Sequence, residues 1–455
     1  MNPTVTTNQA SALRQEFAER LRRPDGSTYV YTYPFKGAYR PIAESKPAQL
    51  AWGIPSGPLN IYVHIPYCEM QCGFCNLFTT VHHSAVAFGR YAQAVCHEAS
   101  IVADQVDWKE AEIDSLYFGG GTPTLLAISE LKHIIQHLRG RFSFRLNAEL
   151  AIESAPSSVD EVKLNDLLEL GFRRISFGVQ SFDDVELRSM GRNQDSGFSK
   201  RMVSAAVLAG FENVNVDLIY GLPNQSLRSW IENIQTATSL GVQTITIYPL
   251  TLRERTGFGR RYRAVPQDFP RNNLLYQYYD TSVDLLSSYG YSQKTMATFA
   301  KRGGGCRHEA NEFKGTPTLG LGASALSYAP TIHYTSGSYF EPTPVATVLA
   351  DYFSAIDKCE LPIRSGIALN RDESSRRHLI LGLLYLGIDR DEFRIKFGEP
   401  LETWFSLELE VLRGEGCIDE KGTRITLSQR GRRFTSLVVG LLASDGVKEL
   451  STGYR

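Results

Sequence analysis

Six strand-like runs alternate with helix-length runs between residues 59 and 250, and this alternation limits the fold more than any other feature. The strand-like runs are short and rich in Val, Ile, Tyr and Phe; they are 59–65, 113–118, 147–153, 173–179, 213–221 and 243–250. The stretches between them carry apolar residues at three-to-four spacing, which is typical of amphipathic helices. Successive β-then-α units predict a parallel sheet with helical crossovers, here an α/β fold built on a partial (β/α)6 barrel of the TIM type.

Chemically unusual residues follow these strands. The first strand runs into "CEMQCGFC", the second into "GGGTPT" (119–124), and later strands end near Glu153, Gln180 and Asp217. In barrels of this kind the carboxyl ends of the strands meet on one rim, where catalytic groups gather. The sequence therefore predicts an active site on that rim.

Three cysteines, Cys68, Cys72 and Cys75, are spaced C-x3-C-x2-C directly after the first strand. A structural zinc site needs four ligands, and no second cysteine pair follows. His64 would complete a Cys3His set, but it precedes Cys68 within a strand, where packing or hydrogen bonding is the commoner role. A [4Fe–4S] cluster normally takes four thiolates, so three would leave one iron open for catalysis. The other cysteines are scattered singly and are typical of small buried side chains in a reducing compartment.

Charge and hydropathy exclude several classes of partner. The 455 residues include 48 basic and 49 acidic side chains, a formal charge of −1, which gives no field favouring nucleic acid or an anionic membrane. No run reaches the ~18 apolar residues of a membrane span. The amino terminus also lacks a basic-then-apolar signal. We therefore expect a cytoplasmic protein with no nucleic-acid partner and no membrane partner.

The length suggests two or three folded units. We expect an N-terminal helix and aromatic-rich extension over 1–57, the barrel over 58–300, a glycine-rich strand and connector over 301–370, and a last unit over 371–455. In the last unit, helices are followed by two short strands about an "EKGT" turn and a terminal helix, which predicts a winged-helix-like α+β domain. Its "RGRR" run is typical of a solvated helix start rather than of a DNA-binding surface.

The motifs "YVHIPYC", C-x3-C-x2-C, "GGGTPT", "FGVQSF", "VDLIYGLPNQ" and "LGLGASALS" resemble those of the radical S-adenosylmethionine (SAM) superfamily. They resemble in particular the subgroup of oxygen-independent coproporphyrinogen III oxidases and haem chaperones, over about residues 58 to 440. The resemblance implies that the three cysteines hold a [4Fe–4S] cluster whose open iron binds SAM. It also implies cleavage of SAM to methionine and a 5′-deoxyadenosyl radical, in a monomer that receives electrons from flavodoxin or ferredoxin.

The same resemblance implies the cofactor contacts. They are Tyr62, Phe74, Gly119, Gly120, Gly121, Thr122, Glu153, Gln180, Arg192, Asp217 and Ile219. Gly121, Thr122 and Ile219 lie where the related oxidase holds a second SAM. From the residues alone, the alternatives are that Glu153 caps a helix and that Arg192 is a solvated loop charge. Asp217 lies in a strand, where an unpaired buried carboxylate would be costly.

Two departures point away from the named activities. The oxidases carry a further cysteine where this chain has Leu77, and the chaperones carry H-N-x-x-Y-W where it has "RHEANEF" (307–313). "CEMQCGFCNLFTT" with "YVYTYPFKGAYRP" (29–41) instead resembles class C radical SAM methylases and their cyclopropane-forming relatives in natural-product biosynthesis. That implies two SAM molecules per site and transfer of a methyl or methylene group to an sp2 carbon of a small-molecule or peptide-derived substrate. An oxidase-like radical enzyme and a haem chaperone are the alternatives.

Overall fold

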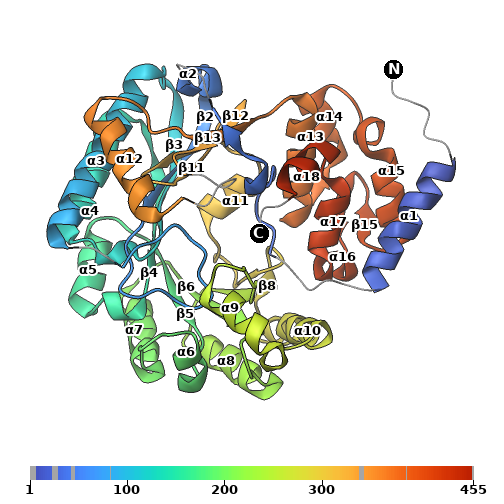
Figure 1. Ribbon diagram of the computed structural model, residues 1–455, viewed down its shortest axis with the longest axis horizontal. Helices are drawn as coiled ribbons and strands as arrows, with labels where there is room; N and C mark the ends of the chain where they lie inside the picture. The colour runs from blue at the N-terminus through green and yellow to red at the C-terminus, as the bar shows by residue number, and fades with distance from the viewer. Residues whose placement is uncertain are drawn as a thin grey trace.

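The computed structural model describes residues 7–22, 29–42, 47–81, 84–337, 343–385 and 387–452. Figure 1 shows two parts, a sheet with its covering helices and a smaller, mostly helical C-terminal unit beside it. Among the described residues, no helix is long and apolar enough to cross a bilayer.

Six parallel strands lie side by side in chain order and form the partial barrel. They are β2 (Ser56–Ile65), β3 (Glu110–Gly120), β4 (Phe144–Ser154), β5 (Arg174–Gln180), β6 (Asn213–Tyr220) and β7 (Thr244–Pro249). Each coincides with a run predicted from composition, and each pairs only in the parallel sense with its barrel neighbours. The expected α/β barrel is confirmed.

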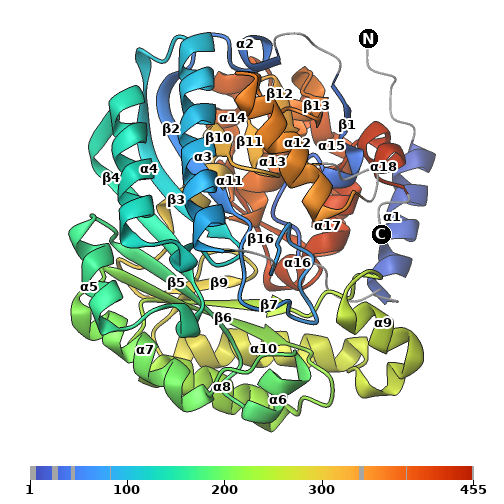
Figure 2. The same ribbon diagram turned by 60° about the vertical axis from the view of Figure 1, so that its left-hand side comes forward.

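Helices cover the outer face of these strands (Figure 2). They are α3 (Ala85–Gln105), α4 (Ile128–Arg141), α5 (Glu161–Glu169), α7 (Ser196–Ala209), α8 (Leu227–Ser239) and α10 (Asn272–Ser288). Several begin at a side chain that caps the first turn: Asp160 accepts a hydrogen bond from the Lys163 N–H, and Ser226 accepts one from the Ser229 N–H. The apolar stripe of each helix packs on the sheet, which buries the main hydrophobic core.

The sheet continues past the six strands at both edges, to thirteen strands in all among the described residues. Beside β2 lie parallel β10 (Thr318–Leu321) and antiparallel β11 (Leu326–Tyr328), β12 (Ile332–Thr335), β13 (Ser365–Ala368) and β1 (Arg40–Pro41). Beside β7 lie β9 (Thr298–Ala300) and β8 (Ser292–Gln293). The segment predicted as a connector thus supplies strands β12 and β13, and its helix α12 (Val345–Asp357) packs on α3. These strands of three or four residues are too short to show a period in the sequence.

The C-terminal unit has its own core. Its elements are α13 (Arg371–Leu384), β14 (Ile388–Asp389), α14 (Arg390–Phe397), α15 (Leu401–Gly414), β15 (Ile418–Lys421), β16 (Arg424–Leu427), α16 (Gln429–Arg433), α17 (Thr435–Leu442) and α18 (Asp445–Ser451). The helices with the β14-β16-β15 sheet form the expected winged-helix-like arrangement. The N-terminal helix α1 (Thr7–Arg22) packs on this unit, far from the barrel strands (Figure 1).

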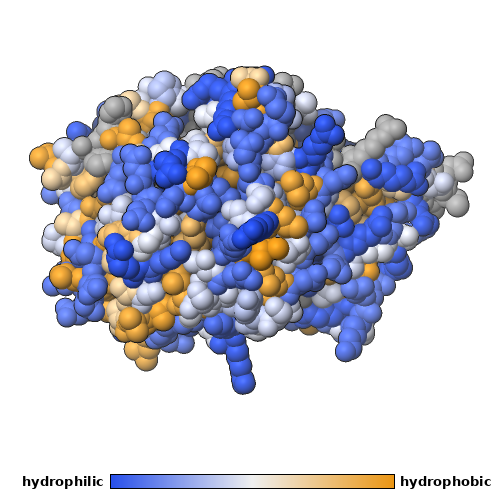
Figure 3. Space-filling model, turned by 90° about the horizontal axis from the view of Figure 1, so that it is seen from below, coloured by the Kyte–Doolittle hydropathy of each residue, from blue (hydrophilic) through white to orange (hydrophobic). Residues whose placement is uncertain are grey.

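Figure 3 shows one face of the molecule from below, where hydrophilic residues predominate and hydrophobic ones form small groups between them. Such scattered apolar residues are normal on a protein surface. This face therefore gives no sign of a large apolar interface.

Candidate active site

One level of the barrel interior keeps contact with solvent. Each of the six parallel strands is buried for most of its carboxyl half, yet each has a half-buried, inward-facing residue there. These are Tyr62, Tyr117, Glu153, Gly178, Asp217 and Tyr248. We call these six residues the lumen ring. Because residues in adjacent strands at one level lie side by side, the ring marks a level of the barrel interior that solvent reaches, which we call the hollow.

The loop that carries the three cysteines begins at this end of β2. Its two ends are tied together, since the Cys68 N–H donates to the Thr80 carbonyl at 3.0 Å and the Thr80 N–H donates to the Pro66 carbonyl at 2.7 Å. All three thiols are half-buried. Burial raises the pKa of each thiol, that of Cys75 to about 11. The loop thus presents three sheltered sulfurs beside the lumen ring.

The "GGG" turn after β3 packs against this loop. The Gly121 N–H donates to the Ile65 carbonyl at 2.7 Å, and a Cβ on Gly121 would lie 3.0 Å from the Cys68 sulfur. Gly120 has φ of +112°, and a Cβ there would lie 2.6 Å from the His64 ring. The protein's own close packing therefore requires glycine at both positions.

Glu153 joins the turn to the lumen ring. Its carboxylate accepts hydrogen bonds from the Tyr117 hydroxyl and from the Gly120 N–H, both at 2.9 Å. Burial raises the pKa of Glu153 to about 7, against the effect of those two donors. Glu153 does not cap the following helix, because Asp160 caps α5. The alternative structural role for Glu153 is therefore wrong.

Asp217 has partners on two strands. It accepts hydrogen bonds from the Asn215 amide at 2.8 Å and from the Ser176 hydroxyl at 3.0 Å. Burial raises the pKa of Asp217 above its usual range. A carboxylate with these donors keeps unused acceptor capacity, which it can direct into the hollow.

Arg192 is buried, and its Nε donates to the Gln194 side chain at 3.1 Å. Its positive charge opposes the effect of burial on the pKa of Cys68 and Cys72, so the guanidinium lies near the cysteine loop. The reading of Arg192 as a solvated loop charge is therefore wrong.

The remaining predicted residues surround the same rim. Gln180 ends β5 with φ of +72°, where β5 and β6 slip in register, a strained conformation that often marks a functional position. Phe74 and Ile219 belong to one apolar cluster beside the cysteine loop. The Thr122 N–H donates to the Tyr67 carbonyl at 2.7 Å. The structure thus brings all the predicted residues to one end of the barrel.

Sequence reasoning missed the floor of the hollow. Helix α11 (Arg307–Phe313) packs on β3, and its Glu309 accepts hydrogen bonds from the Thr298 hydroxyl. Burial raises the pKa of Glu309 to about 7. Arg174 lies near enough for its charge to act on Glu309. Among the described residues, the Nη1 of Arg174 has no hydrogen-bond partner. A signal was available: polar residues recur at every second position of the strands, as in "NVNVD" (213–217), which is typical of a polar barrel interior.

The donor set fits an iron–sulfur cluster. In the described part of the chain, no group of three His, Cys, Asp or Glu residues is placed to hold a single metal ion. A [4Fe–4S] cluster makes a different demand, because each thiolate binds its own iron. Cys68, Cys72 and Cys75 meet that demand by lying on one short loop, close enough for their charges to interact.

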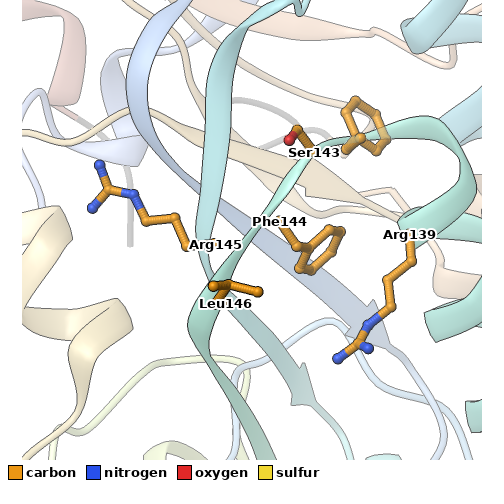
Figure 4. Close-up of a pocket in the computed structure, with 6 residues that line it drawn as sticks. Arg139, Ser143, Phe144, Arg145 and Leu146 are labelled. Carbon is orange, nitrogen blue, oxygen red and sulfur yellow. The ribbon is translucent and has the colours of Figure 1, made fainter.

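A second hollow lies at the opposite end of the strands. It has a volume of about 420 Å³ and is lined by residues 139 and 142–146. Figure 4 shows Arg139 and Arg145 extending to opposite sides of Phe144 and Leu146, at the start of β4. Because the cysteine loop and the lumen ring lie toward the carboxyl ends of the strands, this hollow is not part of the candidate site.

The chain is similar to known proteins in sequence and fold. The radical SAM superfamily model matches residues 62–237, and the HemN C-terminal domain model matches residues 369–434. The heme chaperone HemW of Escherichia coli is 30% identical over 269 residues, 59% of this chain and 69% of that protein. The chain belongs to the radical SAM superfamily, in the subgroup of HemW and HemN. Its family membership implies a [4Fe–4S] cluster and SAM as cofactors.

Two further relatives cover more of this radical SAM protein. HemW of Mycobacterium tuberculosis is 27% identical over 394 residues, 86% of this chain and 96% of that protein. The solved structure of the Escherichia coli coproporphyrinogen III oxidase HemN has a TM-score of 0.78 and 25% identity, covering 91% of this chain and 96% of that one.

These relatives correct the functional expectation. They are haem chaperones and a coproporphyrinogen oxidase, and none is a natural-product methylase. The prediction of a class C radical SAM methyltransferase or cyclopropane-forming enzyme is therefore wrong. That prediction rested on "CNLFTT" and the aromatic-rich segment 29–41. It gave this short local likeness more weight than the motifs along the whole chain.

Proposed function

We propose that this protein is a radical SAM enzyme of the coproporphyrinogen-oxidase type, which removes hydrogen from a tetrapyrrole-like substrate held at the barrel mouth. The observation that carries this proposal is the hollow itself. It combines the three-cysteine loop, the glycine turn, and the carboxylates of Glu153 and Asp217 within one polar barrel. Bound there, the cluster and SAM together would supply a 5′-deoxyadenosyl radical.

The chain's own residues would hold SAM in place. SAM carries a sulfonium and an ammonium cation, and the carboxylates of Glu153 and Asp217 are acceptors for such charge. Cation binding would favour the ionised form of Glu153, whose pKa burial raises to about 7. The rings of Tyr62 and Tyr117, stacked with centroids 6.2 Å apart, would exclude water beside it.

Oxidase-type chemistry is favoured over haem binding by the state of the two histidines in the barrel. His64 contacts the Tyr62 hydroxyl through Nδ1 at 3.1 Å and the Phe78 carbonyl through Nε2 at 2.9 Å. The Nδ1 of His308 lies 2.9 Å from the Ser115 hydroxyl, and its Nε2 lies 3.6 Å from Glu312. An axial ligand to haem iron needs a free ring nitrogen. Neither histidine offers one without breaking these contacts.

A second SAM molecule is a separate part of the proposal. Ile219 lies at the end of β6 among apolar neighbours and beside the polar lumen ring. A place between apolar side chains and the polar lumen ring suits the adenine and the methionine chain of a further SAM. Equilibrium dialysis of the reconstituted protein against labelled SAM should reach two molecules per chain, and saturation at one would contradict this part alone.

The test of the function is anaerobic turnover. The reconstituted protein, reduced by dithionite, should cleave SAM to 5′-deoxyadenosine, and added coproporphyrinogen III should be consumed in step with that product. Cys72→Ala should lose both the cluster and the cleavage, because two thiolates do not retain it. Haemin binding without SAM cleavage would favour the chaperone, and cleavage that ignores coproporphyrinogen III would refute the substrate class.

A further inference from the structure

A basic segment borders the outer side of the cysteine loop. Within that loop, Gly73 donates its N–H to the Met190 carbonyl at 2.9 Å and accepts a hydrogen bond from the Phe258 N–H at 2.7 Å. Phe258 belongs to helix α9 (Gly257–Ala264), which follows β7. A Cβ on Gly257 would lie 3.2 Å from the Gly73 Cα. Helix α9 therefore lies directly against the loop, as both ribbon views show (Figures 1 and 2).

The charge of this segment stands out from that of the whole chain. Residues 253–271 hold six arginines and two acidic residues, a formal +4 in a protein whose total is −1. Arg261 pairs with Asp268 at 2.6 Å. Four of the other arginines are exposed, and in the described ranges none of these four pairs with a carboxylate; they are Arg255, Arg260, Arg263 and Arg271. We call these four residues the basic face.

Helix α9, which carries Arg260 and Arg263, lies beside the loop through which an electron would reach the cluster. Cys72 and Cys75 are half-buried, and the two residues that follow Cys75, Asn76 and Leu77, are exposed, with Leu77 at 51%. A cluster held by this loop would therefore lie just beneath the surface here. Electron transfer between proteins slows steeply with distance, so a donor has to dock close to the loop.

We propose that the basic face is the docking surface of an acidic one-electron carrier protein of the flavodoxin type. This inference rests on the proposed radical chemistry, which consumes one electron for each SAM cleaved. The flavin hydroquinone would give up one electron and become the semiquinone, and that electron would pass to the cluster that Cys68, Cys72 and Cys75 would hold. No bond forms or breaks between the two proteins. Positive charge at the rim of the contact attracts and orients an acidic partner, and Leu77 offers an apolar contact near it.

The experiment uses the reconstituted holoprotein and a bacterial flavodoxin. The double variant Arg260→Glu with Arg263→Glu reverses two charges on α9, and a control, Lys132→Glu with Arg139→Glu, makes the same charge change on exposed positions of α4. The dissociation constant for flavodoxin is measured by titration calorimetry at low and high salt. The α9 variant should bind about tenfold more weakly at low salt, the control should bind like the parent, and the parent's affinity should fall as salt rises.

SAM cleavage is then compared with two reductants. Dithionite, a small anion, needs no docking, so the α9 variant should keep its iron content and its dithionite-driven rate while its flavodoxin-driven rate falls. The docking surface would be overturned if the α9 variant bound flavodoxin like the parent, or if the control lost as much affinity as the α9 variant. It would also be overturned if the dithionite-driven rate of the α9 variant fell as much as its flavodoxin-driven rate. Failure of the parent to cleave SAM with dithionite would refute the proposed function instead, while the binding data would still decide the docking surface.

Discussion

Asp217 connects the hydrogen-bond network of the barrel wall to the hollow. Asp217→Asn keeps the shape and most contacts with Asn215 and Ser176 but removes the negative charge. Because SAM is cationic, we expect its dissociation constant to rise about tenfold or more, with iron content unchanged. Equilibrium binding of SAM measures this. A variant that binds SAM like the parent would make Asp217 a residue of the barrel wall only.

Gly120 is the position in the glycine turn where a side chain is least tolerable. Gly120→Ala would place a methyl group 2.6 Å from the His64 ring at φ of +112°. We expect the free energy of unfolding to fall by about 2 kcal/mol or more, together with poorer cluster retention. Urea unfolding measures the first effect and iron analysis the second.

The control for that variant is Gly140→Ala, within helix α4. A Cβ at Gly140 meets no atom within 4 Å, and alanine favours a helix by up to about 1 kcal/mol. Gly140→Ala should therefore leave the free energy of unfolding unchanged or raise it. A loss at Gly140 equal to that at Gly120 would show that the glycine turn has no special constraint.

At the scale of single residues, the sequence grouped the residues of the rim but not those of the floor. Cys68, Glu153 and Asp217 were named as candidates because each lies within or shortly after a recognisable strand. Glu309 was not, because its place depends on how α11 packs beneath the strands, and Arg174, although it begins β5, was missed because its neighbour Glu309 comes from that helix. The period of two in the strands indicates a polar barrel interior, but it does not show which helix closes that interior.

Among the elements, α3, α12 and the loop after β10 meet at one buried carboxyl group. Glu98 accepts hydrogen bonds from the Gly322 N–H at 2.7 Å and from the Tyr352 hydroxyl at 2.9 Å. Burial raises the pKa of Glu98 from 4.5 to about 7. The folded state therefore binds the Glu98 proton more tightly than the unfolded chain does. The stability that this proton contributes is lost as pH rises from 4.5 to above about 7.

Glu98→Gln removes this titration while keeping an acceptor for the Gly322 N–H. The parent should lose about 3 kcal/mol of stability between pH 4.5 and 7 relative to the variant. Urea unfolding at about pH 5 and about pH 8 gives the difference. The exposed Glu169→Gln is the matched control and should follow the parent. If the free energy of unfolding changed with pH in the same way in the parent and in Glu98→Gln, Glu98 would not titrate in this pH range.

Element prediction succeeded where a strand is long and central. The six barrel strands were found because each is a run of buried, β-favouring residues between helical stretches. Strands β12 and β13 were missed, and the segment around them was taken as a connector. Their pairing comes from partners far along the chain, such as Arg40 with Gly366, rather than from any local pattern.

At the scale of the whole molecule, one aromatic pair joins the barrel floor to the C-terminal unit. Phe313 at the end of α11 stacks on Tyr385 after α13, with ring centroids 5.7 Å apart and planes within 3°. Phe313→Ala should cost about 3 kcal/mol and speed amide hydrogen exchange in residues 388–427. Phe172→Ala, within the barrel core, should cost a similar amount without that regional effect. Equal exchange profiles would show that the pair does not couple the two units.

Helix α1, near the start of the sequence, packs against α15 and α17, near its end. Its Phe17 and Leu21 are buried, and its Arg14 contacts Glu415 at 3.1 Å, next to α15. On a ribosome, about 380 residues separate the synthesis of α1 from that of α15. At ordinary elongation rates the apolar face of α1 then stays uncovered for on the order of 20 to 80 seconds while the barrel forms. During translation this helix is thus a ready target for chaperones, and it docks only after the last helices have emerged.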